Sequence, residues 1–367
     1  MPHRVGRRAP REARATPVPA RSAVRPTSIR EAPTHPVGEP GGPVTPSFAE
    51  RLTLARAELD RDHLTRATPI DELLATPGAR TVLLHDGQAL VDGAALVLLP
   101  PASTAATTAA QGGFALYLGR TLAGAPDADL DAPVIALVVT DDDAAERALA
   151  SARESGRDLA WGDLRRLGAE MSTRDAGIFT EALALANWHR SYGFAPASGR
   201  ATELRQGGWV RVDADTGKEF FPRTDAAIIV GVIDADDRLL LGSNALWPAD
   251  RFSLLAGFVE PGESLEAAVQ REVFEESGVR VVEPRYLGSQ PWPFPASLMV
   301  GFLARVADGA SVETRPDGEE ILDLRWFTRA ELAAAVADAT LRLPGRSSIA
   351  RAIIEEWYGG DLGDDSW

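Results

Sequence analysis

Residues 257–279 constrain the fold of this chain more than any other segment, and they read GFVEPGESLEAAVQREVFEESGV. Pro261-Gly262 is a turn signal, and Ser264 suits the N-cap of a helix that begins at the next residue. Gly278 has no Cβ and suits the left-handed position that follows the last helical turn. The pattern therefore predicts a helix over residues 265–277. Its apolar face is made by two valines four residues apart, Val269 and Val273.

The same helix carries glutamates at spacings that suit a metal site. Glu272 and Glu276 are four residues apart and share a face, with Glu275 beside them. Like charges at this spacing destabilise a bare helix by ~0.2–0.5 kcal/mol per pair. A divalent cation bound between the two glutamates makes their proximity stabilising instead. Carboxylate oxygens are the ligands that Mg²⁺ and Mn²⁺ prefer, and Glu263 in the preceding loop can reach the same place. Arg271 is placed to pair with Glu275. If only the spacing is considered, the alternative to a metal site is an exposed acidic helix with Arg–Glu pairs.

The complete pattern resembles the signature of the Nudix hydrolases, over roughly residues 226–357. Its specified positions are Gly257, Glu263, Arg271, Glu272, Val273, Glu275, Glu276, Gly278 and Val279. The resemblance implies an α/β (α+β) fold, with a mixed β-sheet between helices and bound Mg²⁺ or Mn²⁺ ions. It implies substrates in which a nucleoside diphosphate is linked to another group, and ions that help water attack one phosphorus of the bridge. By motif position it assigns metal binding and catalysis to Glu272, Glu275 and Glu276, without saying which one is the general base.

A second segment, residues 289–299, follows the predicted helix and reads SQPWPFPASLM. Three prolines in five residues predict a stiff extended loop. Such a loop presents the aromatic faces of Trp292 and Phe294, with Gln290 and Ser297 as hydrogen-bonding groups, to a base or a ribose. On composition alone, a rigid hydrophobic linker whose aromatic residues pack in the core is the alternative.

This segment resembles the hallmark of the NADH pyrophosphatases within the Nudix superfamily. The resemblance implies a substrate site lined by the segment's residues, which are Gln290, Pro291, Trp292, Pro293, Phe294, Pro295, Ala296 and Ser297. It also implies two more metal-binding positions, Glu320 and Ala256, and a substrate contact at Ala350. Phe221 and Phe258 take the family's aromatic positions, which sandwich the nicotinamide ring from the two subunits of a homodimer. Core packing is the alternative for both phenylalanines.

The resemblance offers two substrates, and the motifs do not separate them. One is free NADH or NAD⁺, cut to NMN(H) and AMP. The other is the NAD cap on RNA 5′ ends, which is cut at the same bond. A Nudix hydrolase of another linked nucleotide, such as ADP-ribose, is the main alternative. A non-catalytic nucleotide sensor on the same fold is another, although such proteins usually lose glutamates that this chain keeps.

Composition shifts divide the chain into five predicted segments. They are a disordered Pro/Arg/Ala-rich tail (1–47), a smaller α/β N-terminal domain with a structural or dimerisation role (48–191), a zinc-ribbon-like hairpin (192–222), the Nudix domain (223–357) and an acidic C-terminal tail (358–367). Expected helices in the N-terminal domain are 51–62, 70–76, 143–154 and 179–191; expected strands are 81–84, 89–91, 94–99, 114–118 and 134–139. The hairpin strands are predicted at 209–212 and 219–221, and the Nudix domain opens with strands 226–233 and 238–241. No repeat of the solenoid type is visible.

The hairpin segment departs from the family pattern. Many members carry two Cys-x-x-Cys pairs there, which make a closed structural zinc site. The matching positions here are Ala195, Ser198, Asp213 and Thr216. We therefore predict no structural zinc. We expect packing to hold the hairpin instead, through Phe194, Trp209, Phe220 and Phe221.

Composition limits the partners further. With 38 basic and 53 acidic residues the net charge is −15, so the chain lacks a general attraction for nucleic acid, although the tail carries eight arginines against three glutamates. No uncharged apolar run of about 18 residues occurs, which predicts no membrane span. The chain has no cysteine, which fits a reducing compartment, and we expect a cytoplasmic protein.

Overall fold

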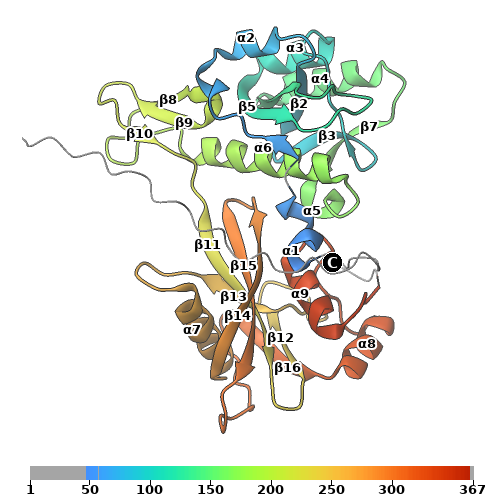
Figure 1. The fold of residues 1–367 in the computed structure, drawn as a ribbon, viewed down its shortest axis with the longest axis vertical. Helices are drawn as coiled ribbons and strands as arrows, with labels where there is room; N and C mark the ends of the chain where they lie inside the picture. Colours follow the sequence, from blue (N-terminus) through green and yellow to red (C-terminus); the bar gives the residue numbers. More distant parts are fainter. Residues whose placement is uncertain (1–46, 57, 364–367) are drawn as a thin grey trace, which may run out of the picture. The chain divides into compact units, whose positions relative to one another are not determined.

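The computed structural model describes residues 47–56 and 58–363. The predicted tail 1–47, except its last residue, and the last four residues of the predicted tail 358–367 lie outside these residues. Within them, the chain forms three β-sheets with helices packed on two of them (Figure 1). The part of the tail 358–367 that is described is packed, because Tyr358 ends a helix and Leu362 is buried.

The N-terminal domain contains a seven-stranded sheet in the order β1-β5-β6-β2-β3-β4, with β7 on β3. Alternate residues of β2 face opposite layers. Val82 and Leu84 pack with α6, whereas Leu83 packs with α3 and α4. This period of two is what a strand buried on both faces requires. The strands are β1 (Leu59–Asp60), β2 (Arg80–His85), β3 (Gln88–Asp92), β4 (Ala95–Leu96), β5 (Gly113–Thr121), β6 (Pro133–Val139) and β7 (Leu159–Asp163); the helices are α1 (Phe48–Arg51), η1 (Thr53–Ala55), η2 (Thr65–Ala67), α2 (Ile70–Leu74), α3 (Thr104–Gln111), α4 (Asp142–Arg153), α5 (Leu164–Leu167) and α6 (Thr173–Ser191).

The second domain contains a six-stranded sheet in the order β14-β15-β11-β12-β16, with β13 on β11. Along β11, Ile228 and Val230 face α7, whereas Ile229 and Ile233 face α8 and α9. The predicted mixed sheet between helices is therefore confirmed, and Figure 1 shows α7 on one side of the sheet with α8 and α9 on the other. The strands are β11 (Asp225–Ile233), β12 (Leu239–Asn244), β13 (Leu255–Phe258), β14 (Val281–Trp292), β15 (Ser297–Val306) and β16 (Ile321–Phe327); the helices are α7 (Leu265–Ser277), α8 (Arg329–Ala337) and α9 (Ile349–Tyr358).

The two large sheets share one pairing scheme, which the motifs described above did not predict. In each sheet one strand pairs in parallel with a second and antiparallel with a third, as β2 does with β6 and β3, and β11 with β15 and β12. The outer pairs also correspond, since β5–β6 matches β14–β15 and β3–β7 matches β12–β16. Helix α3 stands where α7 stands in the second domain, but its sequence TAATTAAQ has no acidic residue. The N-terminal domain thus repeats the fold without the glutamates.

The largest error of the sequence prediction is the helix expected over residues 51–62. Helix α1 ends at Arg51, residues 53–55 form a 3₁₀ turn, and Leu59 pairs with Thr121 on β5. The reason is tertiary packing. Leu52 is buried in the core of the second domain and Leu54 in the core of the N-terminal domain, so the chain changes direction between them.

Other predicted elements are close to those observed. The hairpin of β2 and β3 turns at Asp86-Gly87, both with positive φ, as a two-residue connection requires. Helix α6 begins at Thr173, six residues before the prediction, because Ser172 caps it. Helix α3 and strand β7 were not predicted. Within the described part of the chain, no helix is both long and apolar enough to cross a membrane.

The segment 192–222 forms the predicted hairpin, extended to a third strand. The strands are β8 (Thr202–Arg205), β9 (Val210–Asp213) and β10 (Glu219–Phe220), and the turn η3 (Gln206–Gly208) joins the first two. The expectation that aromatic packing holds this segment was wrong in large part. Phe194 and Phe221 are exposed, and Phe220 is half-buried with Lys218 Nζ 5.5 Å from its ring centre. Trp209 is anchored, with its Nε1 donating to the carbonyl of Tyr117 at 2.8 Å.

A buried carboxylate joins the two turns of this segment instead. Asp213 accepts hydrogen bonds from Ser198 Oγ at 3.1 Å, from the Asp215 N–H at 3.1 Å and from the Thr216 N–H at 3.4 Å. Burial raises the pKa of Asp213, but these hydrogen bonds outweigh it and hold the pKa below its usual value. Ser198, Asp213 and Thr216 are three of the four positions to which the family resemblance assigns zinc-binding cysteines. A hydrogen-bonded carboxylate links these elements in this chain.

We expect Asp213→Ala to lower the melting temperature, because it leaves the Ser198 hydroxyl and two backbone N–H groups without their acceptor. Thermal unfolding followed by circular dichroism would measure the change. Asp215→Ala is the matched control, since Asp215 makes an exposed ion pair with Arg200 that contributes little. Equal melting temperatures for Asp213→Ala and the wild type would contradict a structural role for this carboxylate.

Candidate active site

Helix α7 spans Leu265–Ser277, as predicted, and its ends have the predicted caps. Ser264 Oγ accepts from the N–H of Ala267 at 3.2 Å, and Gly278 takes a left-handed conformation with φ 73°. Val269 and Val273 are fully buried against the sheet. Each such side chain contributes about 1.5–3 kcal/mol when buried. Glu276 lies three residues after Val273, on the same face, so packing of the valines carries its carboxylate into the interior.

Strand β13 passes unusually close to α7 at Gly257. A Cβ added at this glycine would lie 2.0 Å from Cδ and Oε1 of Glu272. Because Gly257 has no side chain, the carboxylate of Glu272 can lie against the backbone of β13. The glycine of the sequence motif thus sets the position of one of the predicted metal ligands.

Arg271 forms ion pairs with three glutamates at the solvent side of the helix. Its guanidinium donates to both oxygens of Glu263 at 2.8 and 2.9 Å, and to the carbonyl of Phe258 at 2.9 Å. It also lies 2.9 Å from carboxylate oxygens of Glu272 and Glu275, which confirms the predicted pairing with Glu275. Glu263 is therefore engaged with Arg271, and it orients this arginine between the other two glutamates.

Glu276 differs from the other glutamates of α7 because it is almost completely buried, with 4% of its surface exposed. Its Oε2 atom has no hydrogen-bond partner among the described residues. Burial, reinforced by the carboxylates of Glu272 and Glu320, raises the pKa of Glu276 to about 8, and a backbone hydrogen bond from Ala256 offsets only part of this. An unpartnered carboxylate oxygen facing other carboxylates is costly, and a divalent cation removes that cost.

Glu320 reaches this place from a separate loop. The loop is held by Asp317, whose Oδ1 accepts from the backbone N–H groups of Glu319, Glu320 and Ile321 at 2.9–3.0 Å. This fixes Glu320 at the start of β16. Glu320 thereby faces Glu276, although the two residues are 44 positions apart in the sequence. The family resemblance had implied a metal-binding position at Glu320.

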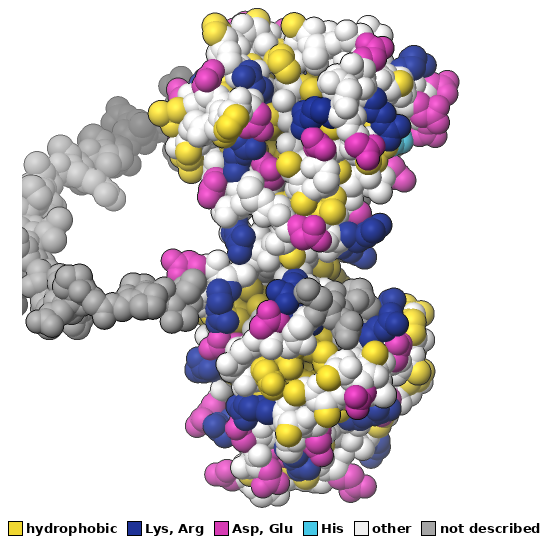
Figure 2. All heavy atoms as spheres, turned by 90° about the vertical axis from the view of Figure 1, so that its right-hand side faces the viewer, with side chains coloured by type: hydrophobic (Ala, Val, Ile, Leu, Met, Phe, Trp, Pro, Cys, Tyr) yellow, Lys and Arg dark blue, Asp and Glu magenta, His cyan; other side chains and the backbone are white. Residues whose placement is uncertain are grey.

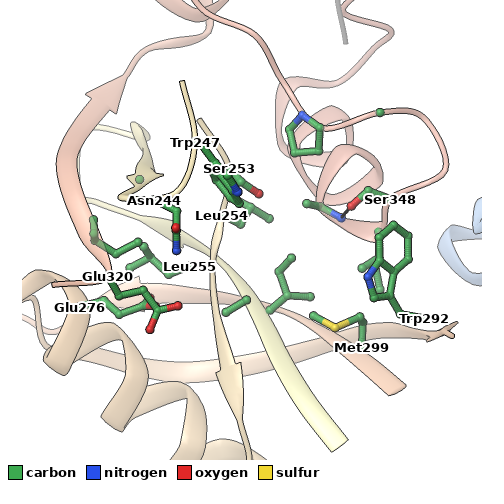
Figure 3. A pocket seen from close by; sticks show the side chains of 18 of the residues that line it. Asn244, Trp247, Ser253, Leu254, Leu255, Glu276, Trp292, Met299, Glu320 and Ser348 are labelled. Atoms are coloured by element: carbon green, nitrogen blue, oxygen red, sulfur yellow. Dashed lines mark hydrogen bonds between the residues drawn. The ribbon is translucent and has the colours of Figure 1, made fainter. Parts of the chain in front are cut away.

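A cavity of about 290 Å³ opens beside these two glutamates. Figure 3 shows the carboxylates of Glu276 and Glu320 side by side at one end, with Trp292 and Met299 at the other. The sequence-predicted residues that line the cavity are Ala256, Glu276, Trp292, Glu320 and Ala350. Lining residues that the sequence did not single out include Asn244, Trp247, Ser253 and Ser347.

Glu272 and Glu275 border the site without lining this cavity. Among the described residues, no three acidic or histidine side chains form a ready-made metal cluster. The reason is electrostatic, since Arg271 holds Glu272 and Glu275, and Glu275 is exposed. The donors nevertheless fit a hard divalent cation. They are oxygen atoms only, and the buried Oε2 of Glu276 has no other partner.

Gln290 lies behind the cavity wall and does not line it. Its side chain is fully buried, and its Oε1 accepts from the N–H of Leu54 at 3.2 Å. Its Nε2 donates to the carbonyl of Ser347 at 2.9 Å. Gln290 thus holds in place the loop that carries Ser347, Ser348 and Ala350 to the cavity.

The rest of the proline-rich segment is not the extended loop that was predicted. Gln290 and Trp292 belong to β14 and pair with Met299 and Ser297 on β15. Pairing with β15 makes these residues part of a strand. A proline is tolerated in a strand at a position where its nitrogen is not needed for a hydrogen bond to the neighbouring strand. Pro293 to Ala296 form the turn, which is tied to helix α6 because Asn187 donates to the Pro293 carbonyl at 2.8 Å. Of the segment predicted to line the site, only Trp292 borders this cavity; Pro291, Pro293, Phe294, Pro295, Ala296 and Ser297 do not.

Phe221 and Phe258 lie on the surface of the single chain. Their exposed fractions are 61% and 59%, so the alternative of core packing is wrong for both. Neither lines the cavity. Their exposure leaves both rings free to contact a ligand or a second subunit.

Arg165 lines the cavity, although no sequence signal singled it out. It belongs to the short helix α5 of the N-terminal domain, yet it lines the cavity. Its guanidinium lies 4.2 Å from the ring centre of Phe294 and 5.8 Å from that of Trp292. An arginine in Leu-Arg-Arg-Leu carries no local signal, and only the packing of the two domains brings it to the cavity.

We expect Arg165→Ala to raise KM for a diphosphate substrate about tenfold with little change in kcat, because it removes a cation that binds ground state and transition state alike. Steady-state kinetics would measure both constants. Arg166→Ala is the matched control, since Arg166 neighbours Arg165 in the chain but does not line the cavity. An unchanged KM, or an equal rise in both variants, would contradict this role.

Comparison with known proteins agrees with the fold and the site. A NUDIX domain model matches residues 222–349, and a model described as an NADH pyrophosphatase-like rudimentary NUDIX domain matches residues 78–188, which explains the repeated pairing scheme. The loop–helix motif and the sheet behind it are therefore those of a Nudix hydrolase.

Curated relatives show to which family of the Nudix hydrolases the chain belongs. The NAD-capped RNA hydrolase NudC of Mycobacterium bovis (strain BCG / Pasteur 1173P2) is 40% identical over 312 residues, which covers 82% of this chain and 90% of the relative. The NudC of Mycobacterium tuberculosis (strain ATCC 25618 / H37Rv) is 39% identical over the same length. The human NAD-capped RNA hydrolase NUDT12 is 37% identical over 200 residues, 51% of this chain and 43% of the relative. This chain belongs to the NADH pyrophosphatase family of the Nudix hydrolases.

Proposed function

We propose that this protein hydrolyses the pyrophosphate bond of NADH and NAD⁺, giving NMN(H) and AMP, and that it removes the NAD cap from RNA 5′ ends. The observation that carries the proposal is the pairing of Glu276 and Glu320 at one end of a cavity whose other end presents Trp292 (Figure 3). Acidic groups at one end suit a cation-bound diphosphate, and an aromatic face at the other suits a planar ring. The names of the relatives support the same substrates.

We assign the cation, Mg²⁺ or Mn²⁺, to Glu272, Glu275, Glu276, Glu320 and the backbone of Ala256. When bound, it would polarise a phosphate oxygen and increase the acidity of an attacking water molecule. Glu276 keeps an oxygen unpartnered for this task. Arg271 keeps Glu272 and Glu275 at the edge of the site. One of the three motif glutamates, Glu272, Glu275 or Glu276, takes the proton of the attacking water.

Free dinucleotide and capped RNA share the bond that is cut, so surface charge bears on the choice between them. On the face shown in Figure 2, basic and acidic side chains alternate and form no continuous basic patch. The chain also carries a net charge of −15. General attraction for RNA is therefore weak, and we expect RNA to bind through its NAD cap rather than through its body.

The test is hydrolysis by the purified protein of NADH, ADP-ribose and NAD-capped RNA, with Mn²⁺, Mg²⁺ or EDTA, and with products identified by chromatography. We expect metal-dependent release of AMP and NMNH from NADH, slower cleavage of ADP-ribose, and release of NMN from the capped RNA. A preference for ADP-ribose would keep the Nudix assignment but reject the substrate. No cleavage of any of them would favour a non-catalytic nucleotide sensor.

We also propose that the protein is a homodimer and works in the cytoplasm. The exposed rings of Phe221 and Phe258 support the first part, because large exposed aromatic side chains often mark an interface. Light scattering coupled to size-exclusion chromatography would give the mass of the particle. A monomer, with Phe221→Ala as active as the wild type, would reject the shared nicotinamide site.

A further inference from the structure

A second cavity, of about 550 Å³, lies in the N-terminal domain and shares no lining residue with the catalytic cavity. Its wall is formed by the β2–β3 turn, the ends of β5 and β6, helix α6, and strands β8 and β9. Apolar side chains make much of this wall, among them Leu84, Phe114, Val138, Leu183 and Leu204. The proposed reaction uses none of these residues.

A buried arginine lines the same cavity. Arg211 has 8% of its surface exposed. Its Nε donates to Thr202 Oγ1 at 2.6 Å, its Nη2 to the Thr202 carbonyl at 3.1 Å, and its Nη1 lies 2.8 Å from Nδ1 of His189. None of these partner groups, which are the hydroxyl and the carbonyl of Thr202 and the imidazole of His189, carries a negative charge. No carboxylate of the described residues forms an ion pair with Arg211, and burial lowers its pKa.

His189 is not a counter-ion for Arg211, because an imidazole is either neutral or positively charged. Its protonation state follows from its hydrogen-bond partners. Its Nε2 lies 2.7 Å from the carbonyl of Gly208, which can only accept, so this nitrogen carries the proton. Nδ1 is then the acceptor for Arg211. Burial, opposed by the hydrogen bond to Gly208, lowers the pKa of His189 to about 4, and the imidazole is neutral at pH 7. The charge of Arg211 is thus left without a counter-ion.

The rim of the cavity carries one arginine and two carboxylates. Arg190 lies 3.8 Å from Asp86, and His85 lies 3.5 Å from Asp142. Both rim carboxylates are exposed and therefore screened by water. Inside the rim, the uncompensated positive charge of Arg211 remains. An isolated buried charge is costly, and an anion that enters the cavity would offset the cost.

We propose that this cavity is a binding site for a small organic anion. A phosphate or carboxylate group would lie against Arg211, and an apolar or aromatic body would lie against Leu84, Phe114 and Leu183. The site is separate from the catalytic glutamates and does not depend on the proposed activity. Its volume exceeds that of the catalytic cavity, so a body the size of a nucleoside fits.

The test uses the ring nitrogens of His189 as a local reporter, because Nδ1 lies 2.8 Å from Arg211. The full chain, labelled with ¹⁵N-histidine, would be titrated with AMP, benzoate and neutral adenosine, and followed by NMR. We expect AMP, benzoate or both to shift the His189 signals in a saturable way, at least about tenfold more tightly than adenosine. The two anions distinguish a phosphate from a carboxylate ligand. No shift with either anion, or equally tight binding of adenosine, overturns the proposal.

Two variants exclude other origins of the signal. Arg211→Met should abolish the response, and Arg211→Lys, which keeps the charge but loses the planar fork, should retain a weaker one. Glu276→Gln, which changes the catalytic cavity, should respond like the wild type. A wild-type response from Arg211→Met, or a lost response in Glu276→Gln, overturns the proposal. The comparison of AMP with adenosine needs no variant, so it decides the matter even if Arg211→Met does not fold.

Discussion

Replacing Glu276 with glutamine is expected to reduce the turnover of NADH by about 100-fold or more while the fold is kept. The amide has the shape of the carboxyl group but lacks the negative charge that binds a divalent cation strongly, and charge stabilisation of this kind is worth about 10²–10³ in kcat. Stability should not fall, because the substitution replaces a buried carboxylate whose Oε2 has no partner and whose pKa is raised to about 8. Kinetics with Mn²⁺ and thermal unfolding in EDTA would measure the two effects.

The matched control for this prediction is Glu266→Gln. Glu266 lies on the same helix, in its first turn, and is exposed. It should keep the activity of the wild type. Near wild-type turnover in Glu276→Gln would show that the cation site is wrongly assigned. A large loss in Glu266→Gln as well would point to a general effect of charge on the helix.

The second large effect is expected from the smallest change at the site, Gly257→Ala. The new Cβ would lie 2.0 Å from Cδ and Oε1 of Glu272, so the carboxylate must leave its place against β13. We expect activity to fall by about 100-fold. The clashing atoms are the far end of a flexible side chain that can move aside, so the folding free energy should change little, which urea unfolding would measure.

Gly193→Ala is the control for Gly257→Ala. A Cβ at Gly193 meets no atom within 4 Å, and its φ is not in the left-handed region. Neither activity nor stability should change. Since Gly257 also has no positive φ, its backbone accepts alanine, and the effect there isolates the contact with Glu272. Full activity of Gly257→Ala would mean that Glu272 does not need this position to serve the site.

Local signals predicted the central helix well, because its determinants lie within a few residues of one another. The cap at Ser264, the left-handed Gly278 and the valines at positions 269 and 273 specify α7 without help from the rest of the chain. The same periodicity places Glu276 on the buried face, so the sequence already contains the reason for its unusual environment.

Prediction failed where two distant segments decide a residue's surroundings. The sequence indicated that Gln290 lines the substrate site, yet its amide bridges Leu54 and Ser347 behind the wall. It indicated a helix through Leu52 and Leu54, yet the two leucines enter different cores. No periodicity within a segment contains such information, because the partners come from elsewhere in the chain.

The sequence by itself determined the chemistry of this protein: the glutamates of α7, the oxygen-only ligand set, and the second motif that placed the chain among the NADH pyrophosphatases. Only the tertiary structure decided what surrounds that chemistry. It brought Arg165 from the N-terminal domain to the cavity beside Glu276, gave Asp213 a linking role between two turns, and left Arg211 buried with no counter-ion among the described residues. The physical reason is range, since helix caps and charge spacing act over a few residues, whereas burial and the pairing of charges depend on segments that meet only when the chain folds.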